Sequence, residues 1–279
     1  MSNVFDTNMI TPTFIFVDGS YYNFYRYFAL LQWWKCAYPD EPIENPFLNI
    51  KFVEKFKKTH VENLQKIHKK LKLGKEIKPI FIIGKDCKRE EIWRIKHFPE
   101  YKANRVNEDF MVGPFFKMVY EENLFQQGGA KAILKHPNLE ADDCIALSVK
   151  YLLNKYSINC QIYIITSDFD YLQLKAPNVN IFNLAYKNIA ENKRSTGKPN
   201  IDLQIKIIMG DSSDNIPSVF PKCGIKTAQK YIDNHELFQK KLHENSKYIK
   251  QYELNQLLVD FTNIPQDLQE EFISSIRNP

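Results

Sequence analysis

The sequence predicts an α/β fold in which a mostly parallel sheet is flanked by helices. Four short runs of mainly β-branched and aromatic residues have the composition of buried parallel strands; they lie at residues 13–17, 79–83, 162–165 and 179–184. Segments with the periodicity of amphipathic helices separate these runs. This alternation favours a parallel sheet, because each parallel strand needs a crossover connection, usually a helix, to reach the next one.

Composition sets broad limits on the class of protein. The chain has 279 residues and a formal net charge of +5, which suits one large domain or two modest ones and permits a polyanionic partner. Its five cysteines are scattered without zinc-ligand or redox spacing, so we expect reduced thiols in a cytosol-like compartment. We see no signal peptide and no membrane-spanning apolar run, and therefore expect a protein that is neither secreted nor membrane-bound. A monomer is the default expectation.

The N-terminal half alternates strands and helices. After the strand at residues 13–17, Gly19 and Ser20 suit a turn and a helix N-cap, and an aromatic-rich helix is predicted to follow. A Lys-rich amphipathic helix is predicted over residues 52–73, where its charges form a solvated face. Residues 106–135 are predicted to be helical, with a break at Gly128–Gly129.

Residues 88–105 form the most basic passage, and its charges alternate with the aromatic residues Trp93, Phe98 and Tyr101. Positive charge for phosphates and rings for bases are what a nucleic-acid strand needs. A solvated basic helix is the alternative interpretation of this passage.

The central stretch, residues 139–174, holds two groups of carboxylates. Glu140, Asp142 and Asp143 are predicted to open a helix, and Asp168 and Asp170 directly follow the strand at 162–165. Each group alone is explained by helix or turn capping. Together they repel one another, and a fold keeps them close only if something cationic joins them.

The C-terminal part is predicted to be helical. Residues 201–232 show a helix–turn–helix pattern in which Gly210 ends the first helix and Asp211 and Asp214 lie in the turn. Gly224 precedes the second helix, and the lysines Lys222, Lys226 and Lys230 are spaced four apart, on one face. Backbone amides and lysines at a helix N-terminus form a natural phosphate site.

Three carboxylates follow buried strands directly or nearly so: Asp18, Asp86 and Asp168. Capping accounts for one such residue but not for three strands that end in the same way. A ring of hard oxygen ligands at the edge of a sheet indicates a Mg²⁺ or Mn²⁺ site. The number of carboxylates suggests two ions, roughly 3.5–4 Å apart, as in nucleases and phosphatases.

Five stretches resemble the structure-specific 5′-nucleases, a family that includes flap endonucleases and the 5′–3′ exonuclease domains of bacterial DNA polymerases. They are VDGSYYNFYR, WRIKHFPEYKANR, EADD, TSDFDYLQL and GDSSDNIPSVFPKCGIKTA, and they span residues 17 to 228 in the family's order. The tail at residues 252–268 resembles the C-terminal part of the ribonuclease H of T-even phages, the phage branch of this family.

The resemblance implies a PIN-like nuclease core at residues 1–200, with a helical arch at about residues 88–128, and a helix–hairpin–helix-type DNA-binding module at residues 201–279 that closes on the core. The implied ligands of one metal ion are Asp18, Asp86, Glu140 and Asp142; Asp142, Asp168, Asp170 and Asp214 would hold or orient the second, and Asp143 and Asp211 would act through water or other ligands.

The resemblance also implies residues that contact the substrate. Lys102 and Arg105 would grip the scissile phosphate, and Arg94 would contact the strand or brace the arch. Phe24 or Tyr25 would stack on a base, while Lys226, Thr227 and Lys230 would bind duplex phosphates beside the turn that contains Lys222 and Gly224.

Three departures from the family pattern affect these assignments. The N-terminal motif has one extra residue before Tyr25–Arg26, so the stacking aromatic could be Phe24 or Tyr25. Asp86 lies in IIGKD rather than in a strand that ends in FD, although its distance to Arg94 fits the phage relatives. The hairpin turn has KCGIKTA where GIGPKTA is common, so Lys222 replaces the first glycine. This replacement argues against a monovalent cation held by the backbone of the turn.

The sequence therefore predicts a 5′–3′ exonuclease or 5′ flap endonuclease that uses two Mg²⁺ ions, with Mn²⁺ as the other candidate. The expected substrate is DNA with a 5′ flap, nick or gap, including an RNA primer on DNA; partners among replication proteins stay open. One rival is a PIN-type ribonuclease of single-stranded RNA, which would not need the GDSSDNIP–GIKTA module. The other is a non-catalytic binder of branched DNA, which predicts lost carboxylates. None of the motif carboxylates is lost.

Overall fold

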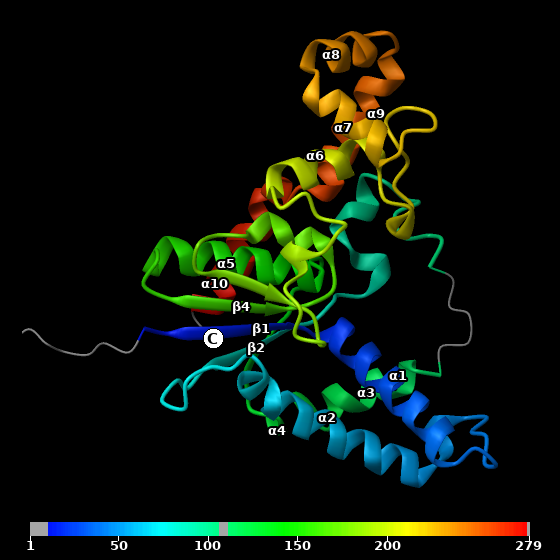
Figure 1. Ribbon diagram of the computed structural model, residues 1–279, viewed down its shortest axis with the longest axis vertical. Coiled ribbons are helices and arrows are strands. Elements are labelled where there is room, and N and C mark those ends of the chain that lie inside the picture. Colours follow the sequence, from blue (N-terminus) through cyan, green and yellow to red (C-terminus); the bar gives the residue numbers. More distant parts are fainter. Residues whose placement is uncertain (1–10, 106–110, 278–279) are drawn as a thin grey trace, which may run out of the picture.

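A computed structural model describes residues 11–105 and 111–277 of the chain. Its centre is a five-stranded, fully parallel sheet with the order β3-β2-β1-β4-β5 (Figure 1). The strands are β1 Thr13–Asp18, β2 Ile80–Gly84, β3 Ala130–Leu134, β4 Gln161–Ile165 and β5 Val179–Phe182. The predicted α/β class is confirmed, and four of these strands lie where the sequence predicts them.

The fifth strand corrects the prediction of helix over residues 106–135. The described part of that range contains two short helices, α3 Gly113–Glu121 and α4 Leu124–Gln127, followed by β3 at the edge of the sheet. Asn123 and Gly129 adopt positive φ angles of 56° and 98°, which end the helical runs. The predicted break at Gly128–Gly129 is therefore real, but a strand follows it.

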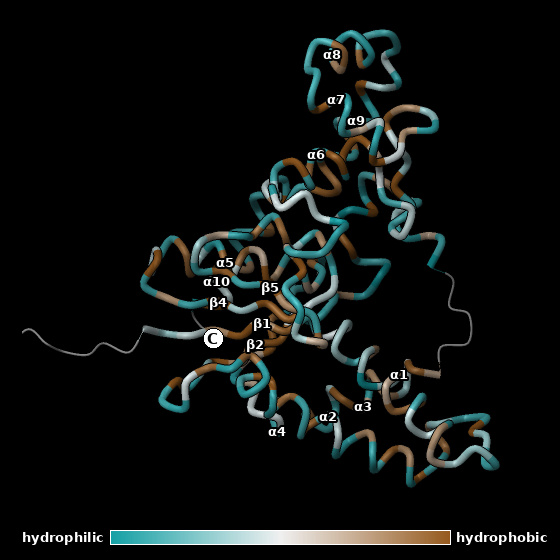
Figure 2. Tube along the Cα trace, viewed as in Figure 1, coloured by the Kyte–Doolittle hydropathy of each residue, from teal (hydrophilic) through white to brown (hydrophobic). Residues whose placement is uncertain are grey.

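Helices cover both faces of the sheet (Figure 1). On one face α1 Gly19–Ala37 and α2 Ile50–Lys70 pack with α3 and α4 around an aromatic core that includes Phe52, Phe56 and Phe125. On the other face α5 Ala141–Tyr156 packs with α10 Gln266–Arg277, whose Phe272 is fully buried. Figure 2 shows the brown, hydrophobic segments gathered at the strands between these two layers.

Four further helices extend beyond the sheet: α6 Pro199–Met209, α7 Ile225–Asp233, α8 His235–His243 and α9 Ser246–Val259. They enclose a small core of their own around Phe220, Phe238 and Leu242. After α9 the chain returns to the sheet and forms α10 against α5. The division at residue 200 stays a prediction. Within the described residues, no helix is long and apolar enough to cross a membrane.

The basic passage at residues 88–105 is not a solvated helix. It consists of two short 3₁₀ turns, Arg89–Glu91 and Trp93–Lys96, followed by a loop, and its Trp93 and Arg94 side chains are buried. The end of the passage is bonded to the turn after α6, since the Lys102 amide donates to the Asp214 carbonyl at 2.8 Å. The base of the predicted arch is thus an ordered part of the fold.

Candidate active site

The site lies at the carboxyl ends of the central strands. The chain winds from β1 through β2 to β3 on one side and then returns to place β4 and β5 on the other side of β1. Ligands of open α/β sheets bind where the winding reverses in this way. Here Asp18 ends β1, Asp168 follows β4 and Asp86 follows β2, so the topology brings the three predicted strand-end carboxylates to one edge.

Asp18 connects the strand to the helix after it. Its Oδ1 accepts a hydrogen bond from the Tyr21 amide at 2.9 Å, so Asp18, and not the predicted Ser20, is the N-cap of α1. Gly19 is required because a Cβ there would lie 2.5 Å from the Gly84 carbonyl oxygen. Burial, followed by repulsion from Asp86, raises the pKa of Asp18 to about 7.

Asp86 and Glu140 join Asp18 around a cleft of about 350 Å³, which Asp142 and Asp168 also line. The Oδ1 of Asp86 accepts from the Ala141 amide at 2.8 Å, and this bond ties the segment after β2 to the start of α5. Ser20, a residue of α1, donates its hydroxyl to the other oxygen of Asp86. The placement of Asp86 in IIGKD therefore does not remove it from the site.

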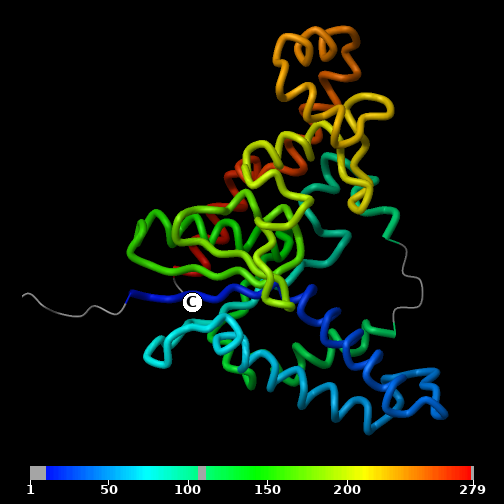
Figure 3. The backbone as a smooth tube through the Cα atoms, in the orientation of Figure 1, coloured from blue at the N-terminus to red at the C-terminus, as the bar shows by residue number. Residues whose placement is uncertain are grey.

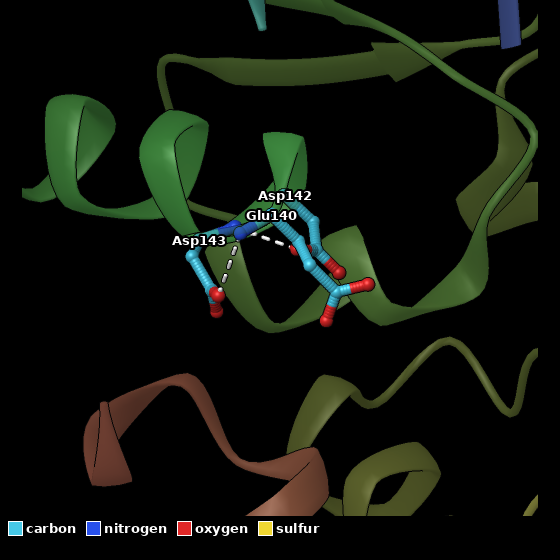
Figure 4. Close-up of side chains that lie close together, drawn as sticks. All are labelled: Glu140, Asp142 and Asp143. Carbon is cyan, nitrogen blue, oxygen red and sulfur yellow. Dashed lines mark hydrogen bonds between the residues drawn. The ribbon is translucent and has the colours of Figure 1, made fainter. Parts of the chain in front are cut away.

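The three acidic residues at the start of α5 point in two directions (Figure 4). The carboxylates of Glu140 and Asp142 lie close together, whereas the Asp143 carboxylate points away from them. Burial, followed by repulsion from Asp143 and Glu140, raises the pKa of Asp142. For Glu140 burial also acts upward, but Lys102 and Arg94 outweigh it and hold the pKa of Glu140 below its usual value.

Arg94 and Asp143 form a buried pair behind the cleft. Two guanidinium nitrogens of Arg94 donate to the two Asp143 oxygens at 2.7 and 2.8 Å, and Nε donates to the Leu258 carbonyl at 2.7 Å. Trp93 adds a bond from its indole nitrogen to Asp143 at 3.0 Å. Both carboxylate oxygens of Asp143 are thus taken by side chains of the chain itself. Neither Arg94 nor Asp143 lines the cleft.

A second carboxylate cluster is formed by Asp170, Asp211 and Asp214, which can place one oxygen each within 4.8 Å of the others. It lines a larger cleft of about 700 Å³, together with Asp168. Arg105 donates to Asp214, and Lys102 reaches from Glu140 to within 3.8 Å of the same residue. The two predicted phosphate-binding cations therefore lie between the two groups of carboxylates.

Lys206 is a functional candidate that the sequence analysis missed. Its ammonium group lies between Asp170 and Asp211, with 2.7 Å to the Asp211 Oδ2. Burial acts to lower the pKa of Lys206, but these carboxylates outweigh it and raise that pKa, while Lys206 holds the pKa of Asp211 at about 2. A lysine among the isoleucines of α6, one turn before the GDSSDN turn, was the available signal.

The predicted nucleic-acid-binding residues lie in two places. Phe24 lines the cleft of about 350 Å³ around Asp18, Asp86 and Glu140, here called the metal-site cleft. Tyr25 does not line this cleft, and it is 38% exposed. Gly224 is the N-cap of α7, Thr227 is half-buried on that helix, and Lys226 and Lys230 line a shallow surface along it.

Lys222 corrects the prediction of three lysines on one helical face. The helix α7 begins only at Ile225, so Lys222 precedes it in the turn, where its φ angle is +57°. That left-handed conformation is the one that glycine adopts without strain. The glycine common at this position in the family therefore has a conformational reason.

The chemistry of the donors fits a divalent metal ion. All the clustered ligands are carboxylate oxygens, which Mg²⁺ and other hard cations prefer over nitrogen or sulfur. Burial and repulsion between neighbouring carboxylates raise the pKa of Asp18 and Asp142, and a divalent cation bound beside them would offset both effects.

Comparison with known proteins identifies the family. Residues 13–201 match the profile described as 5′-3′ exonuclease, N-terminal resolvase-like domain. The 5′-3′ exonuclease of Buchnera aphidicola from Acyrthosiphon pisum is 32% identical over 219 residues, which are 77% of this chain and 68% of the relative. Ribonuclease H of Enterobacteria phage T4 is 33% identical over 151 residues, 48% of this chain and 47% of that protein. The chain belongs to the 5′-3′ exonuclease family and is a nuclease, as predicted.

Solved structures show the same fold. The T5 5′-exonuclease with bound divalent metal ions (zinc) superimposes with a TM-score of 0.64 at 20% identity, covering 95% of this chain and 98% of the other. A flap endonuclease of bacteriophage T5, solved in a pseudo-enzyme-product complex with DNA and metal ions, gives a TM-score of 0.63 at 18% identity with the same coverage. The PIN-like architecture with its C-terminal helices is thereby confirmed.

Proposed function

We propose that this chain is a Mg²⁺-dependent 5′-nuclease that cleaves DNA at a 5′ flap, nick or gap, including an RNA primer annealed to DNA. The observation that carries this proposal is the convergence of Asp18, Asp86, Glu140, Asp142 and Asp168 on one cleft. A divalent ion bound there supplies Lewis acidity, which activates water for attack on a phosphodiester and neutralises developing charge.

The two groups of carboxylates suit two ions. Asp18, Asp86, Glu140 and Asp142 would hold the first, and Asp168, Asp170 and Asp214, with Asp142, would hold or orient the second. Asp211 is engaged by Lys206 and by Ser213, which donates its amide and its hydroxyl, so we assign it an indirect role. Mn²⁺ is the other ion that this all-oxygen donor set would accept.

Lys102 and Arg105 are the residues that would grip the scissile phosphate, because both line the metal-site cleft. Their present partners are Glu140 and Asp214, so a phosphate entering the cleft would compete with carboxylates for the same cations. Arg94 and Asp143 are assigned to bracing, because their charges are paired behind the cleft. Phe24 is favoured over Tyr25 as the ring that stacks on a base, since only Phe24 lines the cleft.

The surface of α7 would bind the duplex part of the substrate, beyond the second carboxylate cluster. Lys226 and Lys230 are exposed there, one turn apart, and the N-cap Gly224 leaves the first amides of the helix free of a side-chain cap. Helix N-termini of this kind bind phosphates. A monomer is sufficient for this arrangement, because every proposed ligand comes from one chain.

The test uses a duplex with a fluorescent 5′ flap, with Mg²⁺ or EDTA, and the variant Asp168→Ala. We expect cleavage near the junction to require Mg²⁺ and to fall by at least 10³-fold in the variant, while binding persists. The control is Asp267→Ala, which removes an exposed carboxylate from α10. A flap that is bound but uncut with every metal would favour a non-catalytic binder, and cleavage of single-stranded RNA alone would favour a PIN-type ribonuclease.

A further inference from the structure

The larger cleft has a wall that the proposed function leaves unused. One side is the second carboxylate cluster, and the other is a loop between β5 and α6 with the sequence KRSTGK, residues 193–198, here called the basic loop. Lys193 and Arg194 line the cleft directly. The yellow-green connection that contains the loop passes the end of the sheet on its way to α6 (Figure 3).

The basic loop is held in place by one carboxylate in the first turn of α6. Asp202 accepts a bond from the Ser195 hydroxyl at 2.6 Å and another from the Thr196 amide at 2.7 Å. The Lys198 amide closes the turn on the Thr196 hydroxyl oxygen at 3.2 Å, and Gly197 supplies the positive φ angle of 76° that the turn needs. The backbone that carries Lys193 and Arg194 is therefore fixed relative to α6.

The charges of the basic loop are available to a ligand. Lys193, Arg194 and Lys198 are exposed, and within residues 11–105 and 111–277 none of them forms an ion pair with a carboxylate. This distinguishes them from Lys102 and Lys206, whose charges are compensated by the clustered carboxylates. Cations that no protein group neutralises attract an anion more strongly.

The cleft is continuous with both proposed binding surfaces. It shares Arg105, Ser167 and Asp168 with the metal-site cleft, and it shares Ile225 with the surface of α7 that carries Lys226 and Lys230. A strand that leaves the first carboxylates towards α7 can therefore follow the larger cleft past the second carboxylate cluster and the basic loop. The ligand of the loop has to be a polyanion that reaches both ends.

We propose that the basic loop is a second phosphate-binding site, which grips the sugar-phosphate backbone of the duplex arm that α7 contacts. The proposal rests on the proposed function and adds to it a second group of phosphate contacts, on the wall of the larger cleft. The loop offers cations, hydroxyls and amides but no aromatic ring, so it contacts phosphates rather than stacking on bases. Its contribution is to hold the duplex while the reaction proceeds elsewhere.

The first experiment compares the double variant Lys193→Ala/Arg194→Ala with wild type. Binding of a 5′-flap duplex is followed by fluorescence anisotropy in EDTA between 50 and 200 mM salt. Two lost phosphate contacts should flatten the plot of log K against log salt by about 1.8 in slope, at 0.9 per contact. Single-turnover cleavage with saturating protein should stay within about twofold, because neither residue touches the reacting phosphate.

The matched control is Lys69→Ala/Lys70→Ala, which removes the same charge from exposed positions at the end of α2. It should leave the salt slope unchanged. The variant Asp202→Ala separates positioning from charge: it raises the net charge by one, so general attraction would tighten binding, whereas release of the basic loop should weaken it. Circular dichroism and melting curves establish that each variant is folded.

A salt slope for the double variant equal to that of the Lys69/Lys70 control would overturn the inference, provided that wild type binds and cleaves the flap. An equal loss of affinity for a single-stranded oligonucleotide would also overturn it, because the proposed ligand is a duplex arm. If wild type neither binds nor cleaves the flap, the proposed function fails first, and the two failures are thus distinguishable.

Discussion

At the scale of single residues, the site is organised by the pairing of carboxylates with buried or half-buried cations. Lys102 forms an ion pair with Glu140, Arg94 forms one with Asp143, and Lys206 lies between Asp170 and Asp211. Removing one member of such a pair leaves an uncompensated charge, which costs more than the pair itself contributes. The cations are therefore needed for the fold before any metal ion or substrate arrives.

Lys206→Met tests this view directly. In EDTA the variant should lose about 3 kcal/mol of stability, because Asp170 and Asp211 lose the cation that offsets their burial and mutual repulsion. For a chain of this length the loss lowers Tm by about 5 °C. Excess Mg²⁺ should restore part of it, since a metal ion at the second carboxylate cluster replaces the missing positive charge.

Differential scanning calorimetry with and without Mg²⁺ measures both effects. The matched control is Lys240→Met, which removes an exposed lysine from α8 and should leave Tm within about 1 °C. If Lys206→Met melts at the temperature of wild type in EDTA, the pairing with Asp170 and Asp211 does not stabilise the protein.

Residue-level prediction from sequence succeeded where a carboxylate follows a strand and failed where a side chain must cross the fold. Asp18, Asp86 and Asp168 could be placed because a parallel sheet gathers strand ends at one edge. The Arg94 contact with Leu258 spans 164 positions in the chain, and no local pattern encodes it. Lys206 was missed although Asp211 follows it closely, because its other partner, Asp170, lies 36 positions away.

At the scale of elements, the entry to α7 carries a backbone that its sequence does not favour. Lys222 has a φ angle of +57°, a conformation that costs an L-residue about 1 kcal/mol or more and that glycine adopts freely. Lys222→Gly should therefore raise the free energy of unfolding by up to about 1 kcal/mol. Denaturant unfolding followed by circular dichroism measures the change.

The comparison for that substitution is Lys230→Gly, in the body of α7. There the backbone is helical, so glycine should destabilise the protein by about 1 kcal/mol. Substitutions of the same type at two lysines are thus expected to act in opposite directions. A loss of stability in both would mean that the turn does not strain Lys222.

Strands that are buried on both faces were easier to predict from the sequence than a strand at the edge of the sheet. The strands β1 and β4 consist of apolar, β-branched runs because the sheet buries them on both faces. Strand β3, with the sequence AKAIL, lies at the edge and exposes Lys131 and Ala132, so its pattern is too weak to separate from helix. The base of the predicted arch is fixed by bonds to the turn at residues 211–215, which local periodicity does not reveal.

At the scale of the whole molecule, the helical layer formed by α1 and α2 contains a fully buried histidine. The His60 side chain donates one bond, from Nε2 to the Asn23 Oδ1 at 2.9 Å, and is otherwise surrounded by aromatic rings. Burial, followed by the charge of Arg26, lowers its pKa to about 3 from an ordinary 6.5. The folded protein therefore holds this imidazole neutral.

This pKa predicts acid sensitivity. Because the folded pKa lies below the unfolded one, the unfolded chain takes up the proton first as pH falls. The stabilisation is complete above pH 6.5 and is lost progressively between about 6.5 and 3, by about 5 kcal/mol at most. Replacing His60 by glutamine, which keeps a donor for Asn23 but cannot titrate, should flatten the fall in stability over this range.

The measurement is urea unfolding of wild type and His60→Gln at several pH values, taken as a difference. The difference matters because Asp18, with its pKa of about 7, acts in the opposite direction in both proteins. The variant His243→Gln, an exposed histidine of α8, serves as the control. Parallel pH profiles for His60→Gln and wild type would show that His60 does not set the acid sensitivity.

The return of the chain to form α10 has a consequence for how the enzyme is made. When a ribosome has produced the chain up to Val259, every strand and every proposed metal ligand already exists. The apolar side of α5 still lacks its cover, because Phe261, Leu268 and Phe272 have not yet emerged. The side of α5 that faces away from the sheet is thus covered by residues synthesised after all of these carboxylates, and a nascent chain acquires a fully supported site only once α10 has emerged.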